Sequence, residues 1–312
     1  MNEIRRHPVV WGNLPDGTPL EFSRITVDGS GHGLHVGFVG GVHGDEYEGP
    51  LALLDLAARL AELPLRGKVT ILPFVNSPAL WTATRTSPFD GANLARIFPG
   101  DTEGTLSHQL ARAVWNEVRG MDALVDCHSG GIANTFAPVA GFYAAGGVIT
   151  EQAAIRSRDL ARATGLPLLW RLPATPGVLS REAAAAGIAV TGCEVGGRGD
   201  AQAGDVAIYL DAFLRVLAHL EMLDAAFAPA PHAPQQALHG DWIVAPAAGL
   251  LRKLVPVGSS VRRGTPCARI ESPEGRTLAE IVAPDDGFIL AERNVARVHA
   301  GDLAVLVAQI LP

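Results

Sequence analysis

Apolar runs and helix-like periodic segments alternate along the first 224 residues of the chain. Several of the apolar runs are continuous, which is typical of strands that helices cover on both faces of a sheet. The predicted strands are 21–27, 34–40, 69–75, 123–127, 139–143, 166–172 and 188–193. The predicted helices are 46–60, 105–118, 149–164, 180–186 and 203–223. This alternation predicts an α/β domain over residues 1–224, with a mostly parallel or mixed sheet.

The pattern changes after this domain. Residues 225–237, AAFAPAPHAPQQA, are rich in Ala and Pro, a composition typical of a linker. Short β segments and turns follow, and they contain an internal repeat. The repeated stretches are VAPAAGLL at 244–251 with VAPDDGFI at 282–289, and VRRGTPCARI at 261–270 with VHAGDLAVLV at 298–307. Two similar β units in tandem predict a small C-terminal β domain, a barrel or sandwich, over residues 238–312.

The two halves of this β domain resemble those of biotinyl/lipoyl carrier domains, which fold as barrel-sandwich hybrids. Such carriers attach their cofactor to a lysine on the hairpin between the halves. The corresponding hairpin here reads ESPEGRTL, residues 271–278, and contains no lysine. We therefore expect a structural or lid role for this domain and not a carrier role.

Composition and charge narrow the class of protein. Of the 312 residues, 48% are hydrophobic and 18% are charged, which is a globular composition with a substantial core. The net charge of −7 argues against a nucleic-acid partner, because no basic stripe is present to neutralise phosphates. No apolar run reaches about 18 residues, so no membrane span is expected. The N-terminal residues lack the apolar core of a secretion signal, and the three cysteines are scattered, which favours a cytoplasmic protein.

His43 and Glu46 stand in the segment GGVHGDEYEGP, directly after the apolar run 34–40. In open α/β sheets, ligand sites lie at the carboxyl ends of strands, and the glycines allow a sharp turn there. The H-x-x-E spacing would place both side chains on one side of a helical turn. An imidazole and a carboxylate are two of the three protein ligands of a catalytic zinc site. The alternative is a capped helix start, with the acidic residues facing the helix N-terminus.

Two further strand ends repeat this arrangement. ALVDCHSGG, residues 123–131, places His128 after an apolar strand, with Asp126 close enough to orient a histidine. His128 is the candidate third ligand, and a set of two histidines and one glutamate suits zinc better than magnesium. AVTGCEVGGRGD, residues 189–200, places Glu194 at a third strand end, where it could act as a general base. Taken singly, each residue has an alternative structural role.

The segment 76–100, NSPALWTATRTSPFDGANLARIFPG, is long and irregular, and it holds Arg85, Asn93 and Arg96. Long irregular segments inside compact domains are usually functional. Arg85 could stabilise the oxyanion that forms when water attacks a carbonyl. Arg96, with Asn93 nearby, could bind a substrate carboxylate through paired hydrogen bonds. The alternative for each arginine is a solvated surface position.

Taken together, GGVHGDEYEG, NSPALWTATR, NLARIFPG, DCHSGG and CEVGG occur in an order and rough spacing that resemble the succinylglutamate desuccinylase/aspartoacylase family, which is related to zinc carboxypeptidases. The resemblance covers residues from about 20 to 224, and the subgroup that looks most similar includes deacetylases of N-acetylated diamino acids. It implies a carboxypeptidase-like mixed sheet flanked by helices and one Zn²⁺ per chain. It also implies that His43, Glu46 and His128 are the zinc ligands, with Glu194 as the base. Arg85 would be the oxyanion-side arginine and Arg96 would bind the substrate carboxylate.

One position departs from this family pattern. Members commonly have Asn before the arginine of the NLNR motif, whereas this chain has Ala95 before Arg96. The expected activity is the zinc-dependent removal of an acyl group from a small N-acyl amino acid. The alternatives are a zinc carboxypeptidase acting on short peptides and a non-catalytic metal-binding protein on the same scaffold. A homo-oligomer is compatible with the sequence, with the β domain as a dimer surface, but no exposed stripe requires one.

Overall fold

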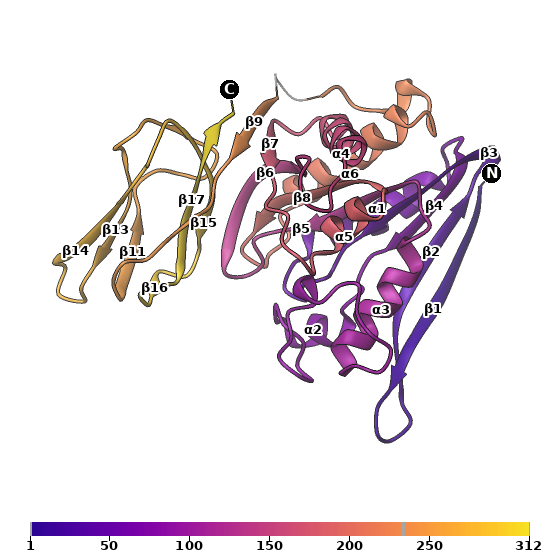
Figure 1. Cartoon of the computed structure of the whole chain (residues 1–312), viewed down its shortest axis with the longest axis horizontal. Coiled ribbons are helices and arrows are strands. Elements are labelled where there is room, and N and C mark those ends of the chain that lie inside the picture. The colour runs from indigo at the N-terminus through magenta and orange to yellow at the C-terminus, as the bar shows by residue number, and fades with distance from the viewer. Residues whose placement is uncertain (1, 232–234, 312) are drawn as a thin grey trace.

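The protein is described by a computed structural model that covers residues 2–231 and 235–311. An α/β part and a smaller C-terminal β unit lie side by side and give an elongated molecule (Figure 1). The helices are α1 (Glu48–Leu60), α2 (Ser77–Thr82), α3 (Leu106–Val118), α4 (Glu151–Ala163), α5 (Leu179–Ala185) and α6 (Ala203–His219), with 3-10 turns η1 (Leu94–Arg96) and η2 (Ala225–Phe227). None of these helices is long and apolar enough to span a membrane.

The larger sheet of the described chain begins with the α/β strands, in the spatial order β1-β2-β4-β3-β5-β8-β6-β7. Strands β4, β3, β5 and β8 run parallel, whereas β1, β2 and β6 pair antiparallel with a neighbour, so the sheet is mixed. These strands are β1 (Glu3–Asn13), β2 (Pro19–Asp28), β3 (Ser30–Val39), β4 (Arg66–Leu72), β5 (Ala123–His128), β6 (Asn134–Phe142), β7 (Leu168–Arg171) and β8 (Ala189–Gly197). The mixed α/β sheet predicted from the sequence is thereby confirmed.

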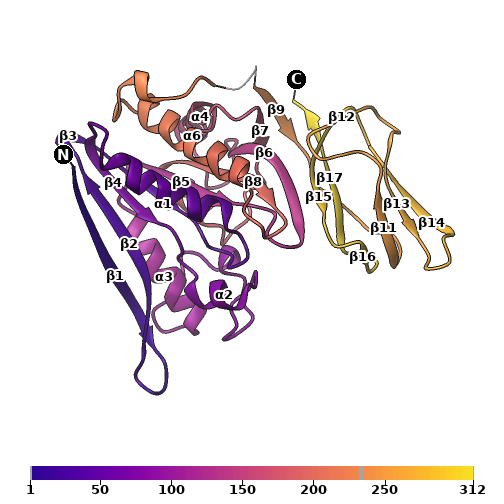
Figure 2. The same ribbon diagram turned by 180° about the vertical axis from the view of Figure 1, so that it is seen from behind.

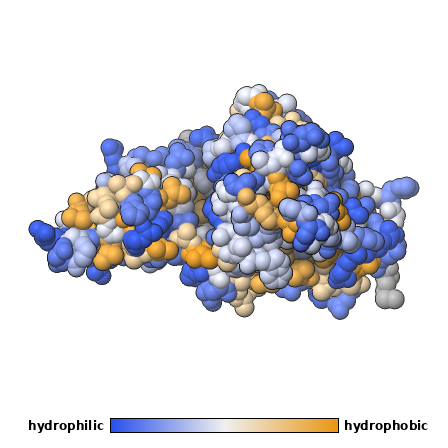
Figure 3. Space-filling view, turned by 90° about the horizontal axis from the view of Figure 1, so that it is seen from below, coloured by the Kyte–Doolittle hydropathy of each residue, from blue (hydrophilic) through white to orange (hydrophobic). Residues whose placement is uncertain are grey.

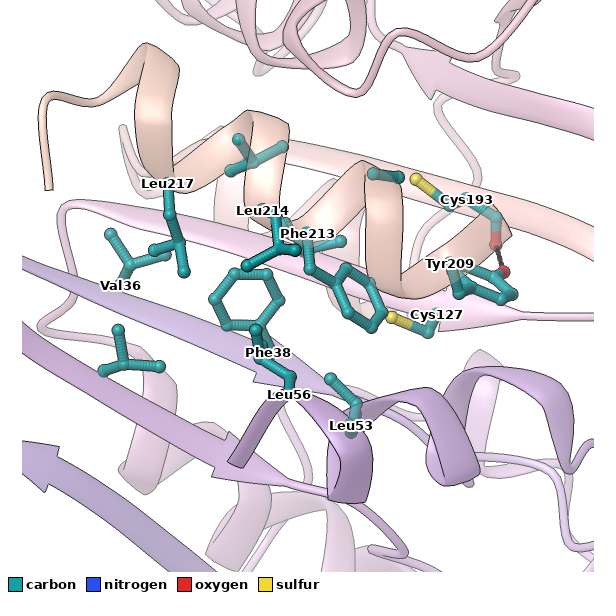
Figure 4. Packing of buried hydrophobic residues seen from close by; sticks show 14 of the residues in the cluster. Val36, Phe38, Leu53, Leu56, Cys127, Cys193, Tyr209, Phe213, Leu214 and Leu217 are labelled. Atoms are coloured by element: carbon teal, nitrogen blue, oxygen red, sulfur yellow. Dashed lines mark hydrogen bonds between the residues drawn. The ribbon is translucent and has the colours of Figure 1, made fainter. Parts of the chain in front are cut away.

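Helices cover both faces of this sheet, as the continuous apolar strands predict. Helices α1 and α6 pack on one face, α3 and α5 pack on the other, and α4 contributes side chains to both cores. Phe38 of β3 lies in the first core, with its ring 5.2 Å from that of Phe213 on α6. Leu53 and Leu56 of α1 close the same core from below in Figure 4. Two apolar layers thus pack against the central strands, one on each face of the sheet.

The C-terminal unit contains only strands among its described elements. They are β9 (Gln236–His239), β10 (Trp242–Val244), β11 (Gly249–Lys253), β12 (Ser260–Val261), β13 (Pro266–Glu271), β14 (Thr277–Val282), β15 (Gly287–Arg293), β16 (Arg297–Val298) and β17 (Leu303–Ile310). Strands β14-β13-β11-β16 form a separate sheet, and β9, β17, β15 and β12 continue the large one (Figure 2). Seen from below, this unit projects from the α/β part, and hydrophobic residues are interspersed with hydrophilic ones on both parts (Figure 3).

Strands from both parts of the chain join in a closed cycle. Strand β6 pairs with β7, β7 with β9, β9 with β17, β17 with β15, and β15 returns to β6. We call these five strands the junction ring. Its interior holds a separate apolar cluster that includes Phe136, Trp170 and Leu306. The proposed division of the chain near residue 225 therefore runs through one continuous sheet.

The structure differs from the predicted elements in several places. The edge strand β1 and the short helix α2 were not predicted. Helix α1 begins at Glu48 and not at residue 46. The predicted linker 225–237 contains η2 and the start of β9, and its residues 232–234 lie outside the described residues. Both copies of the internal repeat form the same succession of strand, turn and strand, but the barrel-sandwich form stays a prediction.

Candidate active site

The predicted site residues come together at the carboxyl ends of three neighbouring parallel strands. His43 and Glu46 follow β3, His128 is the last residue of β5, and Glu194 lies on β8. His128 and Glu194 are direct partners in the β5–β8 register. Because β3 pairs with β5 and β5 with β8, the three strand ends reach the same edge of the sheet.

His43 and Glu46 converge through a turn that precedes the helix, and not through the helical turn that the sequence suggested. Helix α1 begins only at Glu48. Gly41 has a φ of +64°, a left-handed conformation that favours glycine. A Cβ on Gly44 would lie 2.0 Å from the carbonyl carbon of Ala79, so only glycine fits there. The glycines thus permit the close passage of backbone that brings the imidazole back toward the carboxylate.

The three candidate ligands form one buried cluster. One ligand atom from each of His43, Glu46 and His128 lies within 4.8 Å of the others. The Nδ1 atom of His43 is 2.8 Å from Glu46 Oε1, and Nδ1 of His128 is 3.0 Å from Glu46 Oε2. Only 2% of the His43 and Glu46 side chains and 12% of the His128 side chain are exposed. Two imidazole nitrogens and a carboxylate therefore face a common point in the interior.

The other nitrogen of each imidazole lies next to a side-chain oxygen atom. Nε2 of His43 lies 3.1 Å from Asn93 Oδ1, and Nε2 of His128 lies 3.3 Å from Asp126 Oδ1. An oxygen acceptor on the outer ring nitrogen is the usual partner of a metal-binding histidine, because it fixes the tautomer and the ring orientation. Asn93 also caps η1 by accepting a hydrogen bond from the Ala95 backbone N–H at 3.0 Å. This geometry gives Asn93 a role in orienting His43, and its predicted contact with a substrate carboxylate stays a prediction.

Burial and neighbouring charges shift the pKa values of the three candidate ligands in different directions. Burial lowers the pKa of His43, which favours the neutral imidazole that metal binding requires. Burial would raise the pKa of Glu46, but the neighbouring imidazoles hold it well below its ordinary value. Burial would lower the pKa of His128, but the carboxylates of Asp126 and Glu46 raise it well above its ordinary value. These carboxylates thus favour a proton on His128, and a metal ion bound to this imidazole would take the place of that proton.

The cluster fits a divalent cation in its donor chemistry. Nδ1 of His43 is buried and has no hydrogen-bond partner among the described residues, although it lies close to Glu46. A buried ring nitrogen without a partner costs free energy unless a ligand occupies it. Two imidazole nitrogens and one carboxylate are the ligand set of catalytic zinc sites that keep an open position. The residues present therefore fit zinc.

Glu194 faces the same space from β8. Desolvation raises the pKa of its carboxyl group to about 8, and the charges of Glu46 and Asp126 act in the same direction. Its Oε2 atom is buried without a hydrogen-bond partner among the described residues. A carboxyl group poised near neutrality in a pocket is suited to proton transfer.

The two predicted arginines reach the same pocket. Arg85 donates a hydrogen bond to Glu46 Oε1 at 2.9 Å, and 46% of its side chain is exposed. Arg96 donates to the Ala95 carbonyl at 2.8 Å, and burial lowers its pKa. Both guanidinium groups line a pocket of about 140 Å³ together with His43, His128 and Glu194.

Part of the lining of this pocket is apolar, and the sequence analysis did not identify these residues. Trp170 and Leu172 come from β7 and the residue after it, and Val178 precedes α5. The loop between β7 and α5 carries no motif of its own. A larger hollow of about 640 Å³ lies elsewhere, beside β2 and α2, and contains none of the predicted site residues. The smaller pocket is therefore the one that the predicted site residues line.

Tyr209 is a second residue that the sequence analysis missed. It lies on α6 and is fully buried. Its hydroxyl contacts the backbone carbonyl of His128. It also donates a hydrogen bond to the carbonyl of Cys193 at 2.9 Å (Figure 4). These carbonyls belong to the strand ends that carry His128 and Glu194. The hydroxyl thus ties helix α6 to the two strands beneath the site.

Comparisons with known proteins agree with this geometry. A sequence model of the succinylglutamate desuccinylase/aspartoacylase catalytic domain matches residues 32–220. The chain belongs to the succinylglutamate desuccinylase/aspartoacylase family. Within this family, the N-alpha-acetyl-L-2,4-diaminobutyric acid deacetylase of Halomonas elongata is 31% identical over 298 residues, which cover 92% of this chain and 85% of the relative.

Solved structures extend the comparison. A succinylglutamate desuccinylase/aspartoacylase from Rhodobacter sphaeroides superposes with a TM-score of 0.86 at 28% identity, over 98% of this chain and 96% of that one. A metallo-carboxypeptidase from Burkholderia cenocepacia superposes with a TM-score of 0.55 at 16% identity, over 70% of this chain and 65% of that one. At this low identity, the similarity to the metallo-carboxypeptidase concerns the fold alone.

Proposed function

We propose that this chain is a zinc-dependent amidohydrolase that removes the acyl group from a small N-acyl amino acid. The observation that carries the proposal is the convergence of His43, Glu46 and His128 on one point, with Glu194 facing the same pocket. Membership of a family that includes a deacetylase of an N-acetylated amino acid supports the same reaction class. We further expect a cytoplasmic enzyme, and a homo-oligomer is compatible with the fold.

His43, Glu46 and His128 would hold one zinc ion per chain. When bound, zinc acts as a Lewis acid on a carbonyl oxygen and makes water a stronger nucleophile near neutral pH. Asn93 and Asp126 would keep the two imidazoles in the orientation that this binding requires. A positive ion in the cluster would also favour the carboxylate form of Glu194, which otherwise holds a proton at neutral pH.

Glu194 would move the protons of the reaction. As a carboxylate, it accepts a proton from the water that attacks the acyl carbonyl carbon. When the C–N bond breaks, the same group returns the proton to the departing amine, which leaves a carboxylic acid and a free amino acid. The position of Glu194 opposite His128 in the strand register keeps its carboxyl group next to the ligand cluster throughout.

The two arginines would bind the negatively charged groups of the substrate. Arg85 lies at the mouth of the cluster and would donate hydrogen bonds to the carbonyl oxygen as it becomes negative. Arg96 would bind the carboxylate of the amino acid. Because residue 95 is alanine, Arg96 acts here without the adjacent amide that relatives commonly have.

A pocket of about 140 Å³ favours a small substrate over a peptide. Pockets for larger ligands are roughly 300–1,000 Å³. The carboxypeptidase alternative shares the chemistry and needs a cleft that accepts a longer chain. The small volume of the pocket therefore supports the deacylase.

The test combines metal analysis with amine release. Protein purified without chelator should contain one zinc per chain and release amine from N-acetyl or N-succinyl amino acids faster than from dipeptides. Glu194→Gln should keep the zinc and lose about 10²-fold or more in kcat. Glu62→Gln is the matched control, because Glu62 is 74% exposed and lies beyond the far end of α1. Near-normal turnover by Glu194→Gln, or a chain that binds no metal, would refute the proposal, and faster release from dipeptides would favour the carboxypeptidase.

A further inference from the structure

The charged groups that face the pocket are mostly positive or already in use. Arg85 and Arg96 contribute two guanidinium groups to the pocket wall. Among the described residues that line the pocket, Glu194 is the one carboxyl group, and the proposed reaction uses it for proton transfer. Glu46 lies behind this wall, between the two imidazoles. The wall thus offers binding partners for a substrate carboxylate and no free counter-ion for a substrate cation.

Part of the pocket lining is apolar, and one of its side chains is held in place by contacts outside the pocket. Trp170, Leu172 and Val178 form this surface, and Trp170 is only 9% exposed. The indole N–H of Trp170 donates to the Gly240 carbonyl at 3.3 Å, so its polar atom is satisfied away from the pocket. The ring also packs against Phe136 in the junction ring, at a centroid distance of 6.3 Å. A preformed apolar wall of this kind favours an apolar group of the substrate.

We propose that the pocket selects N-acyl amino acids with an uncharged, apolar side chain and discriminates against those with a cationic side chain. This inference rests on the proposed function and specifies its substrate. An ammonium group in the pocket would lose water without gaining a carboxylate partner, and it would lie near two guanidinium groups. The preference would separate this chain from the Halomonas elongata relative, whose name specifies a diamino acid.

Two substrates of nearly equal shape isolate the charge. The side chain of N-acetylnorvaline ends in a methyl group where that of Nα-acetyl-2,4-diaminobutyrate ends in an ammonium group. The zinc-loaded enzyme should hydrolyse the norvaline derivative with a kcat/KM at least about tenfold higher. Equal values, or a preference for the diaminobutyrate derivative, would overturn the inference and leave the proposed function intact. Failure to hydrolyse any N-acyl amino acid would instead overturn the proposed function.

A variant that supplies the missing counter-ion gives a second test. Thr175 lines the pocket from the loop between β7 and α5 and is half-buried, so a polar side chain of similar size can be placed there. Thr175→Asp should shift the ratio of the two kcat/KM values toward the cationic substrate by about fivefold relative to Thr175→Asn, which has the same shape without charge. An equal ratio in the two variants would contradict the electrostatic basis of the selection.

Discussion

Replacing Asn93 tests how the site holds His43. The Oδ1 atom of Asn93 lies 3.1 Å from His43 Nε2 and accepts a hydrogen bond from the Ala95 N–H. Asn93→Ala removes both interactions. Loss of the cap should lower the free energy of unfolding by about 1 kcal/mol. Loss of the acceptor behind the imidazole should weaken zinc binding by about 10–100-fold, which corresponds to roughly 1.4–2.8 kcal/mol.

Asn93→Asp is the matched variant, because its carboxylate offers an oxygen acceptor at the same position. We expect it to keep more of the zinc affinity than Asn93→Ala does. Zinc affinity is measured by competition with a chromogenic chelator, and KM and kcat are measured separately on zinc-saturated protein. A rise in KM for the N-acyl amino acid, with zinc affinity and kcat unchanged in Asn93→Ala, would refute this reasoning. That result would support the substrate-binding role that the sequence predicted for Asn93.

Two further predictions concern the support and the charge of the site. Tyr209→Phe keeps the buried ring but removes the hydroxyl that contacts two strand carbonyls. It should lower the free energy of unfolding, measured by urea titration, by about 1–3 kcal/mol. A change below about 0.5 kcal/mol would show that these contacts do not stabilise the fold. In metal-free protein, the pKa of Glu194 rises from 4.5 in the unfolded state to about 8 in the folded state. Between these two pH values the carboxyl group keeps its proton in the folded state and releases it in the unfolded state. Its contribution to stability is therefore fully present below pH 4.5 and is lost as the pH rises to about 8. Glu194→Gln should therefore show a smaller loss of stability from pH 5 to 8 in the same titrations, and equal losses would show that this group does not titrate as described.

The convergence of the candidate site residues could be predicted because these residues follow regular strands. His128 and Glu194 each stand at the end of a buried apolar run, and parallel strands bring such ends to one edge of the sheet. The position of Glu46 was less predictable. It depends on a turn in which Gly44 passes against the backbone of Ala79, a contact between distant segments that local periodicity does not reveal.

The pocket wall and the outer strands could not be predicted for related reasons. Val178 reaches the site through the irregular course of the loop between β7 and α5, which no motif specifies. Strand β1 is largely exposed and, within the described part of the chain, pairs only with β2, so its sequence has no continuous apolar run to mark it. The pairing of β7 with β9 joins segments on either side of a stretch that reads as a linker. Such features depend on tertiary contacts more than on local pattern.

The junction ring makes the last strands of the chain part of the architecture around the substrate. A shortened polypeptide ending at residue 224 would leave β6 without β15 and β7 without β9. Unpaired strand edges of this kind can pair with strands of other chains and cause aggregation. The same cut would remove the Gly240 carbonyl that anchors the indole of Trp170. Exchange of this C-terminal portion between relatives would thus reshape the binding cavity, even though none of its described side chains lines that pocket.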